Sequence, residues 1–383
     1  MTKPTVRKTE YKPHTYYDYS LLFITLILVC IGLVMVYSTS SYYAVKQKFG
    51  DAAYFFRRQL IAAIIGAGVM VAVSKFDYFW YIKGLGKKGN IRLIYLAYVV
   101  CIALQVYVWQ FGEEVKGAKR WIKIPLVGTF QPSELTKICV ILMVAFVVYM
   151  APKSLDSIKG FGHVWFFVGP LLVLVAIENL STAIIIAGIT FLICFVVARR
   201  KWYFFVAGIL VVAGVVAFIV MGEAFRVERI DAWLNVETHD LGYQIRQGLY
   251  AIASGGLWGK GLGQSMQKLG FIPESHNDMI FSVICEELGI VGALAIILLY
   301  VLLLWRLFVV AINARDLFGS LVCVGIMVHI AMQVLINIAV VTNTIPSTGI
   351  ALPFISYGGT SLVVLMAEMG IALSVSNRIE YER

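Results

Sequence analysis

Long apolar runs dominate the chain, and short polar stretches separate each run from the next. A helix that crosses a bilayer needs about 20 mostly apolar residues. The predicted spans are Leu21–Val36, Leu60–Val73, Ile91–Val108, Leu135–Met150, Val164–Ile177, Ala183–Val197, Phe204–Met221, Ile280–Leu307, Leu317–Val341 and Leu362–Val375. Backbone polar groups in lipid must be satisfied within the helix, so the pattern predicts an all-α polytopic membrane protein with about ten transmembrane helices. The alternating strands of a membrane barrel are not seen in the sequence.

The polar stretches define the organisation around these helices. Residues 1–20 form a polar tail, Glu178–Thr182 is short enough to predict a tight helical hairpin, and 222–279 is one long extramembrane loop. No linker or low-complexity segment interrupts the pattern, so residues 1–383 are predicted to form a single membrane domain.

Composition and charge agree with this picture. The 383 residues are 60% hydrophobic and only 14% charged, against about 25% charged in a typical soluble domain. With the N-terminus placed in the cytoplasm, the cytoplasmic segments hold more than twice as many Lys and Arg residues as the short outer loops. The positive-inside rule therefore predicts that both termini are cytoplasmic and that 222–279 is extracytoplasmic. The net charge of +10 is spread over short loops, which argues against a nucleic-acid partner.

The usual cofactor signatures are missing from the sequence. The six cysteines lie in or beside apolar spans and the five histidines are scattered, so no zinc site is expected. The glycine-rich run at 255–261 follows no strand and continues with Gly261 after Lys260, unlike a phosphate-binding P-loop. We expect no nucleotide and no haem.

Polar residues beside the apolar spans are the candidates for function. Glu134 and Lys137 are three residues apart and share a helix face; they form either a salt bridge at the membrane edge or a positive site for an anionic substrate group. Lys119, Arg120 and Trp121 form either an interface anchor or a phosphate grip.

The long loop carries mixed charges, which favours paired groups over a simple anion funnel. Gln244, Arg246 and Gln247 lie in a predicted short amphipathic helix, and Lys268 is a further cation. At the end of the loop, Asp278 stands at the start of the next span. It is either a helix N-cap or a general base at the outer membrane surface. Glu286, Glu287 and Glu368 lie at membrane depth and are expected to be structural partners.

The stretch 342–361 contains two prolines, several glycines and many hydroxyl groups between apolar residues. This composition predicts a re-entrant loop before the last helix, lining a polar cavity, because irregular backbone at membrane depth is tolerated only in such places.

At these residues the chain resembles the SEDS family, the RodA/FtsW-like peptidoglycan polymerases. The motifs are GAKRWI (117–122), FQPSELTK (130–137), GYQIRQGLYAIASGGLWGKGLG (242–263), IPESHNDMIFSVICEELG (272–289) and PSTGIALPFISYGGTSL (346–362). The resemblance covers nearly the whole chain. It implies a ten-helix fold in the bacterial cytoplasmic membrane and a glycosyltransferase that polymerises lipid II at its outer face. It also implies a polyprenyl-diphosphate-linked glycan as second substrate, contact with membrane lipid and a class B penicillin-binding protein as partner.

The resemblance places the family's essential aspartate on Asp278 and its buried Glu and Lys on Glu134 and Lys137. With Asp278 as the catalytic residue, the residues assigned to substrate binding or support are Glu134, Lys137, Lys119, Arg120, Trp121, Gln244, Arg246, Gln247, Lys268, Glu274, His276 and Ser356. Where the family often has an acidic residue, this chain has Asn179, and Asn277 and Met279 replace Thr and Phe beside Asp278. The last loop looks more like the division or sporulation branch than the elongation branch.

As a mechanism, Asp278 would accept the proton of the attacking sugar hydroxyl, and cations would stabilise the diphosphate leaving group. The candidate cations are Lys119, Arg120, Lys137, Arg246 and Lys268. A divalent ion, Mg or Mn, is a further expectation, and Asp278 is its candidate ligand. Two rival functions stay open: a lipid II flippase, which also suits buried charges and broken helices, and a non-catalytic scaffold for the penicillin-binding protein.

Overall fold

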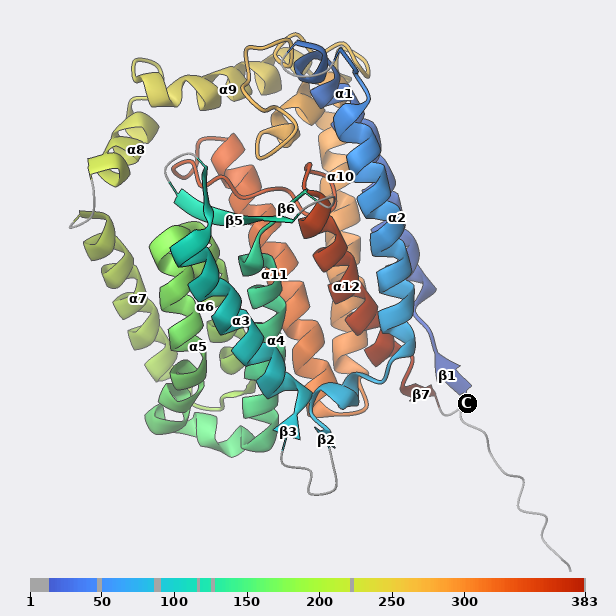
Figure 1. Cartoon of the computed structure of the whole chain (residues 1–383), viewed down its shortest axis with the longest axis vertical. Coiled ribbons are helices and arrows are strands. Elements are labelled where there is room, and N and C mark those ends of the chain that lie inside the picture. The colour runs from blue at the N-terminus through green and yellow to red at the C-terminus, as the bar shows by residue number, and fades with distance from the viewer. Residues whose placement is uncertain are drawn as a thin grey trace, which may run out of the picture.

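The computed structural model describes residues 14–46, 50–85, 91–115, 118–124, 128–220 and 224–381. It is a bundle of long helices with short helices and strands at its ends (Figure 1). The long helices are α1 (Tyr19–Ala44), α2 (Tyr54–Lys75), α3 (Leu93–Phe111), α4 (Pro132–Met150), α5 (Ile158–Glu178), α6 (Leu180–Val197), α7 (Trp202–Val220), α10 (Ile280–Ile312), α11 (Leu317–Val341) and α12 (Gly359–Ser376).

Each predicted span corresponds to one of these helices. Among the described residues, nine helices are long and apolar enough to cross a membrane, and α7 stands in the place of the remaining predicted span. Met221, the predicted end of that span, lies outside the described residues. The all-helical polytopic fold is therefore confirmed.

Polar residues lie at the ends of several helices. Asp18 accepts a hydrogen bond from the backbone N–H of Leu21 at 2.9 Å, and Asp316 caps α11 in the same way through Gly319. Pro132 is in the first turn of α4. Asn179 alone separates α5 from α6 and accepts from the backbone N–H of Thr182. The predicted hairpin is thus confirmed, and Asn179 is its cap.

The strands are short and lie outside the helices. At one end of the bundle, β4 (Glu113–Val115), β5 (Ala118–Ile124) and β6 (Gly128–Phe130) form an antiparallel sheet. The helices α8 (Ala224–Leu234) and α9 (Tyr243–Gly255) lie across the same end (Figure 1), which we call the loop end. The predicted amphipathic helix around Gln244–Gln247 is α9. Residues 222–223 of the long loop lie outside the described residues.

The opposite end of the bundle holds both ends of the described chain. Strand β1 (His14–Tyr16) pairs with β7 (Ile379–Tyr381), and β2 (Gly84–Leu85) pairs with β3 (Ile91–Arg92). The Arg306 guanidinium contacts the Asp18 carboxylate at 2.7 Å and joins α10 to the start of α1. The described termini therefore lie on one side of the bundle, as the predicted topology requires; residues 1–13 of the polar tail are outside the described part.

Burial separates a central helix from the lipid-facing ones. In α4, 78% of the most apolar window is buried, against 22% in α3 and 28% in α10. The helices α2 and α12 pack closely, because a Cβ atom at Gly370 would lie 2.7 Å from the carbonyl oxygen of Met70. Helix α4 is therefore the core of the bundle, and α3 and α10 face outward.

Helix α10 is broken, although the sequence predicts one continuous helix there. The sequence 280–307 reads as one uninterrupted span, but Gly289 has φ 68° and ψ −174° and breaks α10. At the break, the carbonyl of Glu286 accepts from Lys260 N–H at 2.9 Å and that of Glu287 accepts from Gly261 N–H at 3.0 Å. The turn at 256–261 therefore replaces helical hydrogen bonds of α10, and the outer segment 280–288 is tied to the long loop.

Candidate functional site

The re-entrant loop reaches the depth of the membrane. It runs from Thr342 to Gly358 between α11 and α12. A Cβ atom at Gly32, in the middle of α1, would lie 2.4 Å from the carbonyl oxygen of Phe354. The Tyr300 hydroxyl, about five turns into α10, donates to the carbonyl of Pro353. The predicted irregular segment at depth is thus confirmed, and side chains of the bundle satisfy its backbone.

Asp278 lies where this loop meets the start of α10. Helix α10 begins at Ile280 with Met279 as N-cap residue, so Asp278 does not occupy the capping position. Its side chain is half-buried, and its Oδ2 atom is 3.8 Å from where a Cβ of Gly349 would stand. The Asn337 amide donates to the carbonyl of Asp278 at 2.7 Å and to that of Ile350 at 2.8 Å. Asp278 is therefore held by its backbone against the re-entrant loop.

Two neighbouring backbone contacts continue this attachment. The Ser356 hydroxyl donates to the carbonyl of Asn277 at 2.8 Å and accepts from the backbone N–H of Leu352 at the same distance. The backbone N–H of Tyr357 donates to the carbonyl of His276 at 2.9 Å. The structure thus brings together three predicted site residues, Asp278, His276 and Ser356. The last two position the segment through its backbone.

An aromatic cluster forms one wall of this region. The buried His276 ring packs against Phe55, Tyr43 and Tyr357 at centroid distances of 4.6, 5.4 and 5.5 Å. Burial raises the pKa of the Tyr357 phenol, and the neighbouring Arg58 guanidinium opposes that rise. The cation Arg58 therefore stands at the edge of the cluster that surrounds the Asp278 segment.

Glu134 and Lys137 form the predicted ion pair inside the bundle. The Lys137 Nζ and Glu134 Oε1 atoms are 2.9 Å apart, and the Ser361 hydroxyl donates to the second carboxylate oxygen of Glu134 at 2.8 Å. The Lys137 side chain is 1% exposed. The predicted salt bridge is therefore confirmed. Through Ser361, the pair also joins the start of α4 to the start of α12.

The predicted phosphate grip lies on strand β5. Lys119 and Trp121 are paired in register with Glu114 and Glu113 of β4, and Lys119 is exposed. The Arg120 guanidinium donates through Nε to the carbonyl of Glu178 at 2.8 Å and joins the sheet to the hairpin of α5 and α6. Gly117, the first residue of the motif, lies outside the described residues.

The site residues predicted in the long loop mostly form hydrogen bonds with other residues of the same loop. Arg246 donates to the carbonyl of Glu237, and Gln244 donates to that of Pro273 at 3.4 Å. Glu274 has φ 49° and its carboxylate accepts from the Asn277 amide at 3.0 Å. Gln247 is half-buried in α9. Gln244 and Glu274 thus shape the turn that leads to Asp278.

Lys268, a predicted candidate cation for the leaving group, is buried in the structure. It is 6% exposed, and its Nζ atom lies 2.8 Å from Glu287 Oε1 and 3.0 Å from Ser38 Oγ. The neighbouring Glu286 contacts Lys260 Nζ at 2.7 Å and accepts from Ser265. Lys268 is therefore a buried partner of Glu287, and both glutamates fix the long loop to α10, as expected of structural partners. Glu368 likewise pairs with His329 at 2.9 Å.

Two amides that hold the re-entrant loop are absent from the predicted site residues. Asn337 is 1% exposed in α11, and Gln59, 1% exposed in α2, donates to the carbonyl of Ser356 and accepts from the backbone N–H of Gly358. Both are polar residues in or beside an apolar span, and that signal marks functional positions in membranes.

Within the described part of the chain, three or more His, Cys, Asp or Glu side chains do not gather at any point where they could hold a metal ion. The expected divalent ion would therefore not find three such protein ligands in that part of the chain.

Comparisons with known proteins identify relatives along almost the entire chain. A family model described as "Cell cycle protein", FtsW/RodA/SpoVE, matches residues 19–381. Stage V sporulation protein E of Bacillus subtilis is 40% identical over 95% of this chain and 98% of its own length. A probable peptidoglycan glycosyltransferase FtsW of Trichlorobacter lovleyi is 37% identical over 94% of this chain and 93% of its own.

Solved structures share the fold. A chain from a study of polymerization and crosslinking by a peptidoglycan synthase complex superposes with a TM-score of 0.76, at 25% identity over 94% of this chain and 97% of that one. The rod shape determining protein RodA of Thermus thermophilus superposes with a TM-score of 0.66, at 24% identity over 96% of this chain and 98% of its own.

Proposed function

Because the chain belongs to the FtsW/RodA/SpoVE family, the SEDS family whose motifs it carries, we propose that it is a peptidoglycan glycosyltransferase of cell division or sporulation. Relatives that are 34–37% identical are named probable peptidoglycan glycosyltransferases, and the 40% identical relative is a sporulation protein. The reaction is the polymerisation of lipid II into a glycan strand that stays linked to its polyprenyl diphosphate.

The placement of Asp278 carries the catalytic part of the proposal. A hydroxyl is a poor nucleophile, and a positioned carboxylate activates it by accepting its proton. The bond that forms joins the acceptor sugar's C4 oxygen to the donor's anomeric carbon. The bond that breaks joins that carbon to the diphosphate, which leaves with the electron pair, and the hydroxyl proton passes to the Asp278 carboxylate. The support for this role is that the Asn337 amide fixes the backbone of Asp278 against the re-entrant loop.

The leaving diphosphate gains negative charge, so cations beside it favour the reaction. Lys119 and Arg120 on β5 and Arg246 on α9 lie at the loop end and are the candidate cations for this role. Lys137 and Lys268 are each engaged with a buried carboxylate. We assign those two lysines to holding the site, and a bound Mg or Mn ion stays a prediction.

The orientation follows from the lysine and arginine distribution. In this proposal the loop end faces the outside of the bacterial cytoplasmic membrane, and the end with β1 and β7 faces the cytoplasm. The lipid tails of both substrates lie between helices and their sugars at the loop end. The solved relative is part of a complex that coordinates polymerization and crosslinking, which supports a class B penicillin-binding protein as the partner here.

The test is glycan formation from labelled lipid II by purified protein, alone and with its cognate class B penicillin-binding protein. We compare wild type with Asp278→Asn, which removes the base and keeps the size of the side chain. Asp240→Asn, an exposed position of the same loop, is the matched control. We expect polymer from wild type and the control and none from a folded Asp278→Asn protein. Polymer from Asp278→Asn at the wild-type rate would contradict the assignment of the base.

Two rival functions predict different results in the same experiment. A lipid II flippase moves lipid II across liposome membranes without glycan growth, and a scaffold supports its partner equally well with Asp278→Asn. The buried charges that suit a transporter are paired in this structure, as Lys137–Glu134, Lys268–Glu287 and His329–Glu368. A structural role accounts for these pairs, so the polymerase is favoured.

A further inference from the structure

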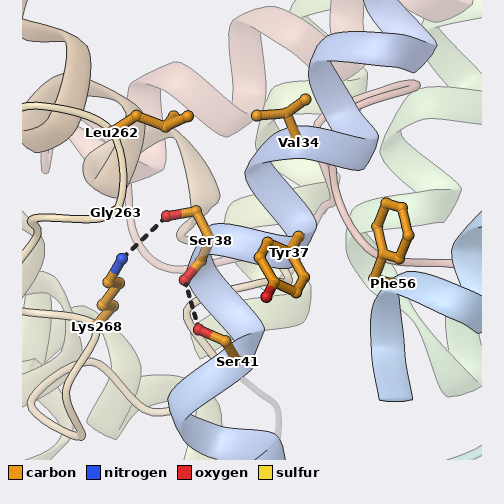
Figure 2. Close-up of a pocket in the computed structure, with 8 residues that line it drawn as sticks. All are labelled: Val34, Tyr37, Ser38, Ser41, Phe56, Leu262, Gly263 and Lys268. Carbon is orange, nitrogen blue, oxygen red and sulfur yellow. Dashed lines mark hydrogen bonds between the residues drawn. The ribbon is translucent and has the colours of Figure 1, made fainter. Parts of the chain in front are cut away.

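A cleft opens at the loop end between α1, α2 and the loop residues 262–268, on a surface that the proposed reaction does not use. Its volume is about 470 Å³. Figure 2 shows Val34, Tyr37 and Phe56 on the helix side and Leu262 and Lys268 on the loop side. Most of these side chains are apolar, but one end of the cleft carries an ammonium group.

The open side of the cleft faces the bilayer. Val34 and Tyr37 belong to a membrane-spanning helix and are 47% and 48% exposed, and Leu262 is 54% exposed. Apolar side chains exposed on a transmembrane helix contact lipid, since water is excluded at that depth. What covers this cleft in a membrane is therefore a lipid molecule.

The polar groups gather at one end of the cleft. In Figure 2, Val34 and Leu262 lie at one end of the group, and Lys268, Ser38 and Ser41 lie toward the other. Val34 and Ser41 are seven residues apart on α1, which is about 10 Å along the helix, and Ser41 is nearer the loop end. The lining of the cleft thus changes from apolar to polar toward the membrane surface. A lipid of the outer leaflet has the same order, with its acyl chains deeper and its polar headgroup at the surface.

Lys268 is the charged residue of this lining. An ammonium group has three N–H donors. Among the described residues, its partners are Glu287 and Ser38, at 2.8 and 3.0 Å. One donor is thus left for a ligand. Because Glu287 already compensates the charge, the site offers one hydrogen bond and no net positive charge. It therefore suits one phosphodiester oxygen better than a diphosphate, whose several charges need more than one cation.

We propose that this cleft binds a phospholipid of the outer leaflet, with an acyl chain between Val34 and Leu262 and the phosphodiester at Lys268. The lipid would be bound apart from the substrates. On the same two helices, Phe55 packs on His276 and the carbonyl of Thr39 accepts from Ser275, whereas Phe56 and Ser38 face the cleft. The lipid therefore supports the loop that leads to Asp278 from the side away from that residue.

The test uses the full-length protein in lipid nanodiscs. Phosphatidylglycerol with a photoreactive group in one acyl chain is crosslinked, and the labelled peptides are identified by mass spectrometry. We expect labelling of the peptides that contain Val34 and Leu262. Leu262→Trp narrows the apolar end and should reduce this labelling about tenfold. Leu298→Trp on the lipid-facing side of α10, 57% exposed, should leave it unchanged.

Two further probes test what the polar end recognises. Diacylglycerol with the same photoreactive chain lacks the phosphodiester and should label the cleft about tenfold less than phosphatidylglycerol. Equal labelling by diacylglycerol, or labelling that Leu262→Trp leaves unchanged, would overturn the proposal. Stronger labelling by a photoreactive polyprenyl phosphate would also overturn it and make the cleft a substrate site. The readout needs no polymerisation, so it stands or fails independently of the proposed function.

Discussion

The side-chain amide of Asn337 joins Asp278 to the re-entrant loop, with donor–acceptor distances of 2.7 Å to the carbonyl of Asp278 and 2.8 Å to that of Ile350. One buried group thus fixes two segments that α10 and α11 separate in the sequence. Because Asn337 touches the backbone of Asp278 and not its carboxylate, we regard it as a positioning residue.

The first prediction is that Asn337→Ala slows glycan formation without preventing membrane insertion. The substitution leaves two carbonyls without their donor, at a cost of about 1–3 kcal/mol each. A small displacement of a reacting group can reduce the rate by about 100-fold. We expect the turnover number to fall about 10- to 100-fold, with a smaller change in the half-saturating concentration of lipid II.

The matched control is Asn313→Ala, an exposed residue after α10 whose amide donates to the carbonyl of Val309. It should keep the wild-type turnover. Wild-type turnover in Asn337→Ala would show that the position of Asp278 does not depend on this amide.

The second prediction concerns Gly349, whose backbone is in the left-handed region with φ +69°. An alanine there costs roughly 1–2 kcal/mol, and its relaxation moves the backbone beside Asp278. We expect Gly349→Ala to lower both the melting temperature and the polymerisation rate. Gly50 has φ +61° with open space around it, so Gly50→Ala should carry a similar strain and keep the rate. If Gly349→Ala and Gly50→Ala polymerise lipid II at the same rate, then the conformation of the re-entrant loop at Gly349 does not affect catalysis.

The third prediction tests the depth of the re-entrant loop. A Cβ atom at Gly32 would lie 2.4 Å from the carbonyl oxygen of Phe354, and overpacking of this kind costs about 1–3 kcal/mol or more. We expect Gly32→Ala to lower the melting temperature in detergent. Gly169 in α5 has open space around it; there alanine should be neutral or stabilising because of its higher helix propensity. A stable Gly32→Ala protein would mean that the loop does not reach this depth.

Features that depend on local spacing could be predicted from the sequence. The apolar runs predicted the long helices, the short gap before Leu180 predicted the hairpin, and the three-residue spacing predicted the Glu134–Lys137 pair. Each of these follows from neighbouring residues on one helix or turn.

Features that join distant segments could not be predicted in this way. Asn337 is 59 residues from Asp278, and Lys268 meets Ser38 across 230 residues. Their contacts depend on which helices pack together, which apolar sequences do not specify. The break at Gly289 could not be predicted for a related reason, because its lost helical hydrogen bonds are replaced by the turn at 256–261, which is distant in the sequence.

The last prediction concerns the buried pair of Lys268 and Glu287, whose side chains are 6% and 0% exposed. Removing one partner of a buried pair leaves an uncompensated charge and costs about 3–5 kcal/mol, whereas replacing both partners is often close to neutral. We therefore expect Lys268→Met to reduce the melting temperature strongly and the double variant Lys268→Met/Glu287→Gln to recover most of the loss. The exposed pair of Arg315 and Glu380 is the matched control, because such surface pairs contribute at most about 1 kcal/mol. If the double variant is no more stable than Lys268→Met, then the lysine acts through contacts other than Glu287, and the attachment of the long loop to α10 rests on Glu286 and the turn at 256–261.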